Sequence, residues 1–128
     1  MSHFSKIKTT IRDIKILKMA LSDLGLVWKD NTILYNDDSK QQYNIDLAIT
    51  QTNNKNIGFA WNGFEYELIA DYQFWQQPYS IDCFIEKLSQ SYAYNSIISE
   101  GINQGFTKVY SQLLANGVIS VTLQRWLY

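Results

Sequence analysis

Cysteine, histidine and proline are almost absent from this chain, which has one residue of each among its 128. A single cysteine, Cys83, excludes an intrachain disulfide and a cysteine-rich metal site. No apolar segment approaches the roughly 18 residues that span a bilayer, and the first residues lack the apolar region of a signal peptide. With six glycines and no low-complexity run, the composition is not that of a disordered chain. We therefore expect a soluble, folded protein of a reducing compartment.

Apolar residues, by contrast, are plentiful. The chain is 46% hydrophobic and 15% aromatic, which supplies ample material for a core. At this length, folding buries roughly two-thirds of the surface that the unfolded chain exposes. We therefore expect residues 1–128 to form a single domain.

The net charge is close to zero, at −1, but the first 18 residues are basic. They contain five cationic side chains and one acidic side chain, which give +4: Lys6, Lys8, Arg12, Lys15, Lys18 and Asp13. Such an asymmetry fits a surface that binds nucleic acid or another anion. The preferred interpretation is a solvated strand edge and helix face, because five cations spread over two elements need not cluster.

The stretch from Ile57 to Ile69 predicts a β-hairpin with Asn62-Gly63 at its turn, the preferred dipeptide for a two-residue type I′ turn. Side chains alternate along a strand, so this turn places six apolar side chains on one face, in the pairs Trp61–Phe64, Phe59–Tyr66 and Ile57–Leu68. The other face is small and acidic, with Gly58, Ala60, Glu65, Glu67 and Ile69. We expect the aromatic face to be buried and the other face to contact water.

Two helices are predicted from capping residues and from apolar periodicity. Asp13 can cap a helix that runs to about Leu24, with Gly25 at the favoured C′ position. Ser80 can cap a second helix that reaches about Ile98. Each helix has an apolar stripe, which indicates one buried face. The stripes are Ile14, Leu17, Leu21 and Leu24 in the first helix, and Ile81, Phe84, Ile85, Leu88 and Tyr92 in the second.

The remaining segments are predicted as strands, at residues 3–11, 26–28, 33–35, 43–50, 106–115 and 118–127, with a polar turn at residues 29–32. Asn116-Gly117 joins the last two as a hairpin and sets Lys108 nearly opposite Arg125. The predicted fold class is α+β: a single antiparallel sheet built from hairpins, with two helices on one face. The order of elements is compatible with an elaborated ferredoxin-like topology.

Several segments also resemble one protein family: the opening MSHFSKIKT, the tripeptide DLG at Asp23–Gly25, and the block WNGFEYELIAD-x₃-W-x₂-P that begins at Trp61. From Met1 to Tyr128 the chain resembles the family of hypothetical chloroplast reading frame thirty-five, a plastid and cyanobacterial domain of unknown function. The resemblance implies a protein of the plastid stroma, or of the cytoplasm in a cyanobacterium. It implies no catalytic residue, cofactor or partner.

No residue pattern predicts catalysis, and we expect no catalytic residue, metal or cofactor. His3 lies beside the start of the chain and is interpreted as a strand-surface residue rather than part of a triad. Cys83 falls in the first turn of the second helix, where the dipole favours a thiolate, but ordinary burial is the preferred interpretation. The dipeptide Asp37-Asp38 lacks the spacing of a calcium loop. Glu65 and Glu67 lie on one strand, whereas glycosidase carboxylates flank a substrate.

Two groups of residues remain as candidate binding sites. Asp71, Phe74, Trp75 and Tyr79 follow the hairpin and either cap the open end of the core or form an aromatic surface for a partner. The second group is cationic and would bind an anion; it comprises Lys108, Arg125, Lys6, Lys8 and Arg12. Like charges opposite each other are unfavourable, so the alternative for Lys108 and Arg125 is an exposed end of the sheet.

We therefore favour a non-catalytic accessory or assembly factor that binds another protein. One alternative is a domain that binds single-stranded nucleic acid or an anionic small ligand. The near-neutral charge and the scarcity of arginine, with two in the chain, count against it. The other alternative is a small-molecule enzyme with a site on the sheet, because a fold does not by itself fix a function.

Overall fold

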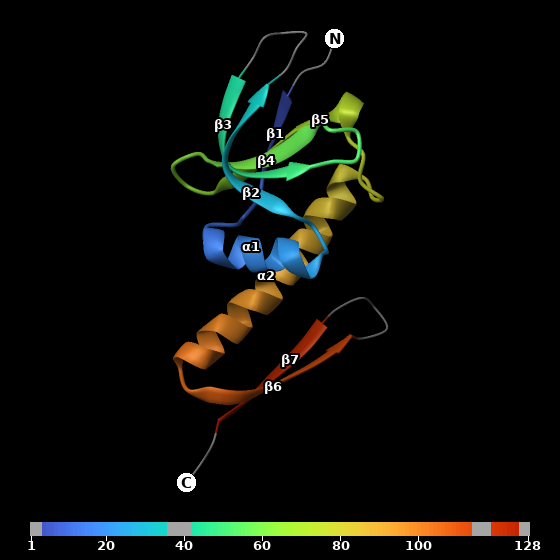
Figure 1. Ribbon diagram of the computed structural model, residues 1–128. Helices are drawn as coiled ribbons and strands as arrows, with labels where there is room; N and C mark the ends of the chain where they lie inside the picture. The colour runs from blue at the N-terminus through green and yellow to red at the C-terminus, as the bar shows by residue number, and fades with distance from the viewer. Residues whose placement is uncertain (1–3, 36–41, 114–118, 126–128) are drawn as a thin grey trace.

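The computed structural model describes residues 4–35, 42–113 and 119–125 (Figure 1). In chain order its elements are β1 (Phe4–Lys8), α1 (Ile14–Asp23), β2 (Trp28–Tyr35), β3 (Gln42–Thr50), β4 (Asn56–Trp61), β5 (Tyr66–Asp71), the 3₁₀ turn η1 (Tyr72–Phe74), α2 (Ile81–Asn103), β6 (Phe106–Leu113) and β7 (Ile119–Arg125).

Five of the strands form one antiparallel sheet, in the order β1-β5-β4-β3-β2. Side chains from both helices pack against the same face of this sheet, so the predicted α+β class is confirmed. The predicted turn at residues 29–32 is wrong, because β2 continues through it. Asn31 has φ of 47° there, a left-handed conformation that asparagine tolerates better than most residues.

The last hairpin, β6–β7, forms a two-stranded sheet of its own and contacts α2. The prediction of a single sheet therefore holds for β1 to β5 only. A ferredoxin-like sheet would include a strand that follows the second helix, whereas both strands after α2 lie outside the five-stranded sheet. A two-stranded hairpin is marginally stable alone, so packing on α2 supports it.

Both helices begin where their capping residues predict. Oδ1 of Asp13 accepts hydrogen bonds from the backbone N–H groups of Lys15 and Ile16, and Gly25 has φ of 76° just beyond the end of α1. The predicted end of α2 near Ile98 is wrong, because the helix continues to Asn103. A glycine inside a helix lowers helix stability by about 1 kcal/mol relative to alanine. Gly101 is nevertheless part of α2, where it is buried against other residues.

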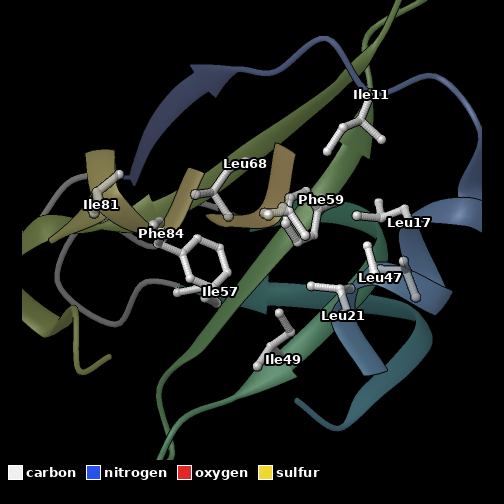
Figure 2. Packing of buried hydrophobic residues seen from close by; sticks show 13 residues of the cluster. Ile11, Leu17, Leu21, Leu47, Ile49, Ile57, Phe59, Leu68, Ile81 and Phe84 are labelled. Carbon is white, nitrogen blue, oxygen red and sulfur yellow. The ribbon is translucent and has the colours of Figure 1, made fainter. Parts of the chain in front are cut away.

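The main core lies between the helices and the sheet (Figure 2). Leu17 and Leu21 of α1 and Phe84 and Leu88 of α2 are fully buried there. They meet sheet residues that include Leu47, Ile49, Ile57, Phe59 and Leu68. The predicted stripes of both helices are therefore confirmed as their buried faces.

The β4–β5 hairpin forms where predicted, but with a longer turn. The register pairs Trp61 with Tyr66 and Phe59 with Leu68, so residues 62–65 form a four-residue loop instead of a type I′ turn. Asn62 accounts for the difference, because its Oδ1 accepts two backbone N–H hydrogen bonds within the loop, both at 2.8 Å. The pairing is shifted by two residues, and a shift by two leaves the facing of each strand unchanged.

The predicted burial of the aromatic face is only partly confirmed. Ile57, Phe59 and Leu68 are fully buried, whereas Trp61 is 46% exposed and Phe64 is 66% exposed. The last two lie at or in the loop of the hairpin, which projects at the side of the sheet beyond the helices (Figure 1).

The other face of the sheet is not left to water, contrary to prediction. A second small cluster is buried on it and comprises Leu34, Ile45, Ala48 and Ile69. Ile45 lies so close over Gly58 that a Cβ at position 58 would be 2.3 Å from Cδ1 of Ile45. Phe4 of β1 also meets Tyr43 of β3, with ring centroids 5.4 Å apart. Since β5 and β4 separate these strands in the sheet, the contact indicates that the sheet curls over this face.

Candidate functional site

The segment from the last residue of β5 to the cap of α2, residues 71–80, contains the aromatic candidates of the sequence. Asp71 is buried and caps η1, because its Oδ1 accepts a hydrogen bond from the backbone N–H of Gln73 at 3.0 Å. Oγ of Ser80 caps α2 by accepting from the N–H of Cys83 at 3.2 Å. The segment is therefore fixed at both ends by a side-chain cap.

Gln51, which the sequence patterns do not single out, ties this segment to the turn between β3 and β4. Its amide nitrogen donates to the carbonyl oxygens of Lys55 and Phe74, both at 3.0 Å. Its Oε1 accepts from the backbone N–H of Gln76 at 2.7 Å and from Nε2 of Gln77 at 3.2 Å. The side chain is buried and uses both of its donors and both acceptor positions. The periodicity of the sequence does not identify a residue such as Gln51, because its hydrogen bonds form only where two turns meet in the folded chain.

Trp75 caps the end of the main core. Its ring contacts Phe84 edge to face, with centroids 5.2 Å apart, and its Nε1 donates to the carbonyl oxygen of Tyr79 at 2.7 Å. Phe74 is half-buried, and Nζ of Lys55 lies 5.0 Å from its ring centroid. The sequence left two interpretations of this segment, a cap on the open end of the core or an aromatic surface for a partner. The position of Trp75 fits the cap.

Two tyrosines of the segment remain open to solvent. Tyr72 is 60% exposed and Tyr79 is 39% exposed. Nζ of Lys87 lies 4.9 Å from the centroid of the Tyr79 ring. We call Tyr72, Phe74 and Tyr79, with Lys55 and Lys87, the aromatic loop surface.

A second aromatic surface lies at the opposite end of β5, at the loop of the β4–β5 hairpin. The Trp61 and Tyr66 rings meet at 60° with centroids 5.0 Å apart. Cζ of Arg12 lies 4.6 Å from the centroid of Phe64. The backbone joins the two pairs, since the N–H of Tyr66 donates to the carbonyl oxygen of Ile11 at 2.8 Å. We call Arg12, Trp61, Phe64 and Tyr66 the hairpin-tip surface.

Acidic groups surround the phenol of Tyr66. Burial is the largest cause that raises the pKa of Tyr66, followed by the negative charges of Asp46 and Asp13 and by Tyr92. Oδ2 of Asp46 accepts a hydrogen bond from the backbone N–H of Trp61 at 2.8 Å, and the Tyr92 hydroxyl accepts one from the N–H of Asp13 at 3.1 Å. Residues from β3, β5 and α2, together with the cap of α1, therefore converge here.

The predicted cations lie on separate features. Lys6 and Lys8 are exposed on β1, and Nζ of Lys6 lies 5.3 Å from the centroid of the Tyr43 ring. Arg12 belongs to the hairpin-tip surface. The structure thus brings Arg12 to aromatic side chains that the sequence had assigned to the core.

The predicted juxtaposition of Lys108 with Arg125 is wrong. In the β6–β7 register Lys108 pairs with Gln124, and Arg125 pairs with Phe106. The backbone register is irregular between Phe106 and Lys108. The two cations therefore occupy different register positions instead of one.

The remaining catalytic candidates fall at separate places in the chain, some of them outside the described residues. Among the described residues, no three side chains of histidine, cysteine, aspartate or glutamate are grouped to hold a metal ion. Glu65 lies in the hairpin loop, whereas Glu67 lies in β5 and pairs with Ala60 of β4. The prediction that the two glutamates share a strand is therefore wrong. Cys83 is a half-buried free thiol. His3 and Asp37-Asp38 lie outside the described residues.

Within residues 4–35, 42–113 and 119–125, no helix combines the length and the apolar character needed to cross a bilayer.

Comparison with known proteins places this architecture in a family. Residues 20–122 match the family described as "Protein of unknown function (DUF1257)". The chain is 51% identical to "Uncharacterized protein ycf35" of Guillardia theta, with 98% of each chain covered. It is 48% identical to the protein of the same name in Pyropia yezoensis and 40% identical to that in Cyanophora paradoxa, with all of each chain covered. No solved structure matches the chain. The chain therefore belongs to the DUF1257 family of proteins of unknown function, as its resemblance to chloroplast reading frame thirty-five implied.

Proposed function

We propose that this chain is a non-catalytic accessory or assembly factor that binds another protein through the aromatic loop surface. The exposure of Tyr72 and Tyr79 on one short segment carries the proposal. Tyrosine is among the residues that dominate binding hot spots. It offers a large apolar ring and a hydroxyl group while losing little conformational entropy on binding.

The rigidity of the segment supports the same conclusion. Caps at Asp71 and Ser80 and the buried amide of Gln51 hold its backbone in one conformation. A segment that is already ordered loses less conformational entropy when a partner binds. Asp71 and Trp75 therefore contribute to binding by positioning the exposed rings.

The charges beside the rings indicate the chemistry of the partner. Lys55 lies over Phe74 and Lys87 lies over Tyr79, so two of the three aromatic side chains of this surface have a cation over the ring. A partner surface that combines apolar groups with carboxylates complements this arrangement. The names of the relatives support a plastid protein, and we propose the stroma as its location, or the cytoplasm in a cyanobacterium.

The nucleic-acid alternative draws less support from the geometry. Lys6 lies over Tyr43 and Arg12 lies over Phe64, so two of the predicted cations engage aromatic rings on different surfaces. An electrostatic groove that follows a nucleic-acid backbone needs such cations in a continuous row.

The proposal is tested by affinity purification of tagged full-length protein from its native compartment, after cross-linking and with quantification by mass spectrometry. The double variant Tyr72→Ala/Tyr79→Ala is compared with Ile102→Ala, which removes an apolar side chain as exposed as Tyr72, at 61%, from the far end of α2. Loss of a hot-spot side chain costs about 2 kcal/mol or more, so the double variant should lose its partner while Ile102→Ala retains it. Unchanged recovery of the same proteins with a correctly folded double variant would overturn the proposal.

A further inference from the structure

We propose that the hairpin-tip surface is a second binding site, which takes an arginine side chain of a partner protein against the Trp61 and Tyr66 rings, with Asp46 as the counter-ion. The site lies at the opposite end of β5 from the aromatic loop surface. The inference rests on the proposed role in protein binding only for the existence of a partner, and its residues are separate.

The aromatic pair supplies the first element of the site. Trp61 is 46% exposed, and its ring meets that of Tyr66 at 60° with centroids 5.0 Å apart. Two rings at such an angle present more than one π face to an incoming group. The π face of an aromatic ring is negative and attracts cations, most strongly for tryptophan.

The carboxylate of Asp46 supplies the second element. Its Oδ2 is held at 2.8 Å by the backbone N–H of Trp61, which fixes the negative charge beside the aromatic pair. The same charge is among the causes that raise the pKa of Tyr66, so it also acts on the second residue of the pair. Among the described residues the ion pair joins Lys18 to Asp30, so Asp46 has no cationic partner there.

The charges around the pair favour a cation over an anion. Asp46 of β3 and Asp13 at the cap of α1 both act on the Tyr66 phenol, and Tyr92 of α2 is the further titratable group there. Arg12 is the cation of this surface, and its guanidinium already lies over Phe64. The Trp61–Tyr66 pair is therefore an uncovered aromatic surface in a negative environment.

The chain contains an occupied example of the same arrangement. Nζ of Lys18 lies 4.8 Å from the centroid of the Trp28 ring and 2.9 Å from Oδ1 of Asp30. A tryptophan face and a carboxylate thus hold one cation together in α1 and β2. Within the described residues, Trp61 and Asp46 present the same two groups without a cation from the chain itself. An arginine suits the site because its planar guanidinium stacks on rings and pairs with carboxylates.

The test uses the ¹⁵N-labelled full-length protein and the peptide Gly-Arg-Gly-Arg-Gly with blocked ends, followed through the tryptophan indole N–H resonances. We expect a saturable shift of the Trp61 resonance, with the Trp28 resonance unchanged because Lys18 already covers that ring. The same peptide with citrulline in place of arginine keeps the shape and loses the charge. The citrulline peptide should bind at least about fivefold more weakly than the arginine peptide, and so should a peptide with glutamate in place of arginine.

Two variants assign the effect to the site. Asp46→Asn keeps an acceptor for the N–H of Trp61 but removes the charge, so we expect the affinity to fall about fivefold; Trp61→Ala should abolish binding. Tyr72→Ala/Tyr79→Ala should bind the arginine peptide as the wild type does, which separates this inference from the proposed function. Equal binding of arginine and citrulline peptides, an unchanged affinity in Asp46→Asn, or no shift at millimolar peptide would overturn it. A Trp61 shift that follows protein concentration alone would identify a second copy of the chain as the occupant and would equally overturn it.

Discussion

Replacement of Gln51 by alanine should both destabilise the protein and release the aromatic loop surface. The substitution removes the donors to the carbonyl oxygens of Phe74 and Lys55 and the acceptor for the N–H of Gln76. The Phe74 oxygen keeps a hydrogen bond from Nδ2 of Asn53 at 3.1 Å, and the Lys55 oxygen keeps one from the backbone N–H of Gln51 at 3.3 Å. The N–H of Gln76 is therefore the backbone group that loses its partner. Each buried polar group left without a partner costs roughly 1–3 kcal/mol.

Water that enters the space left by the side chain can satisfy part of this loss. We therefore expect a net decrease of about 2 kcal/mol in the free energy of unfolding, equivalent to roughly 6–8 °C in Tm for a chain of this size. Urea denaturation followed by circular dichroism measures the decrease. Amide hydrogen exchange should show faster exchange at Gln76, because its N–H group loses its acceptor.

The matched control is Gln42→Ala, which truncates an exposed glutamine at the start of β3. An exposed substitution of this kind changes stability by less than about 0.5 kcal/mol. If Gln51→Ala and Gln42→Ala have the same urea midpoint, the argument that Gln51 joins the two turns is refuted.

Three other perturbations test the fold and its electrostatics. Gly58→Ala brings a methyl group to 2.3 Å from Cδ1 of Ile45 and 2.9 Å from a backbone oxygen, so unfolding by urea should show a loss of about 2 kcal/mol; an unaltered midpoint would contradict the close approach. Asp13→Ala removes the cap of α1 and should cost about 1 kcal/mol in the same assay, with retention of full stability as the opposing result. The raised pKa of Tyr66 means that the folded state keeps the phenol proton above pH ~10, where the unfolded chain releases it. Stability should therefore fall as pH rises from about 10 through the folded-state pKa, and Asp46→Asn should lessen the fall because it removes one of the charges that raise this pKa. An equal pH dependence in the two proteins would count against the assigned cause.

Local patterns predicted the features that depend on neighbouring residues in the chain. Asp13 and Ser80 cap their helices as expected, because a cap needs only an oxygen that reaches the first free N–H groups. The buried stripes of both helices follow from the 3.6-residue period. The position of the β4–β5 hairpin follows from Asn62-Gly63. Its turn type did not follow, because the side chain of Asn62 competes for the loop N–H groups.

The candidate surfaces were less predictable than the fold. The sequence identified the segment that carries Phe74 and Trp75, but it could not reveal that Gln51 holds that segment. It assigned Trp61 and Phe64 to the core, because alternation shows which face a residue shares and not how far the helices cover that face. The exposure of these two rings became apparent only in the folded chain.

The sequence by itself determined the α+β class, the two amphipathic helices with their caps and the family, since each depends on spacing along the chain. The tertiary structure decided the curl of the sheet over Gly58, the separation of β6–β7 from the main sheet and the convergence of Asp46, Asp13 and Tyr92 on Tyr66. These features join residues that lie far apart in the chain, and no periodicity records such contacts. Both aromatic surfaces are therefore products of packing, although every residue in them is visible in the sequence.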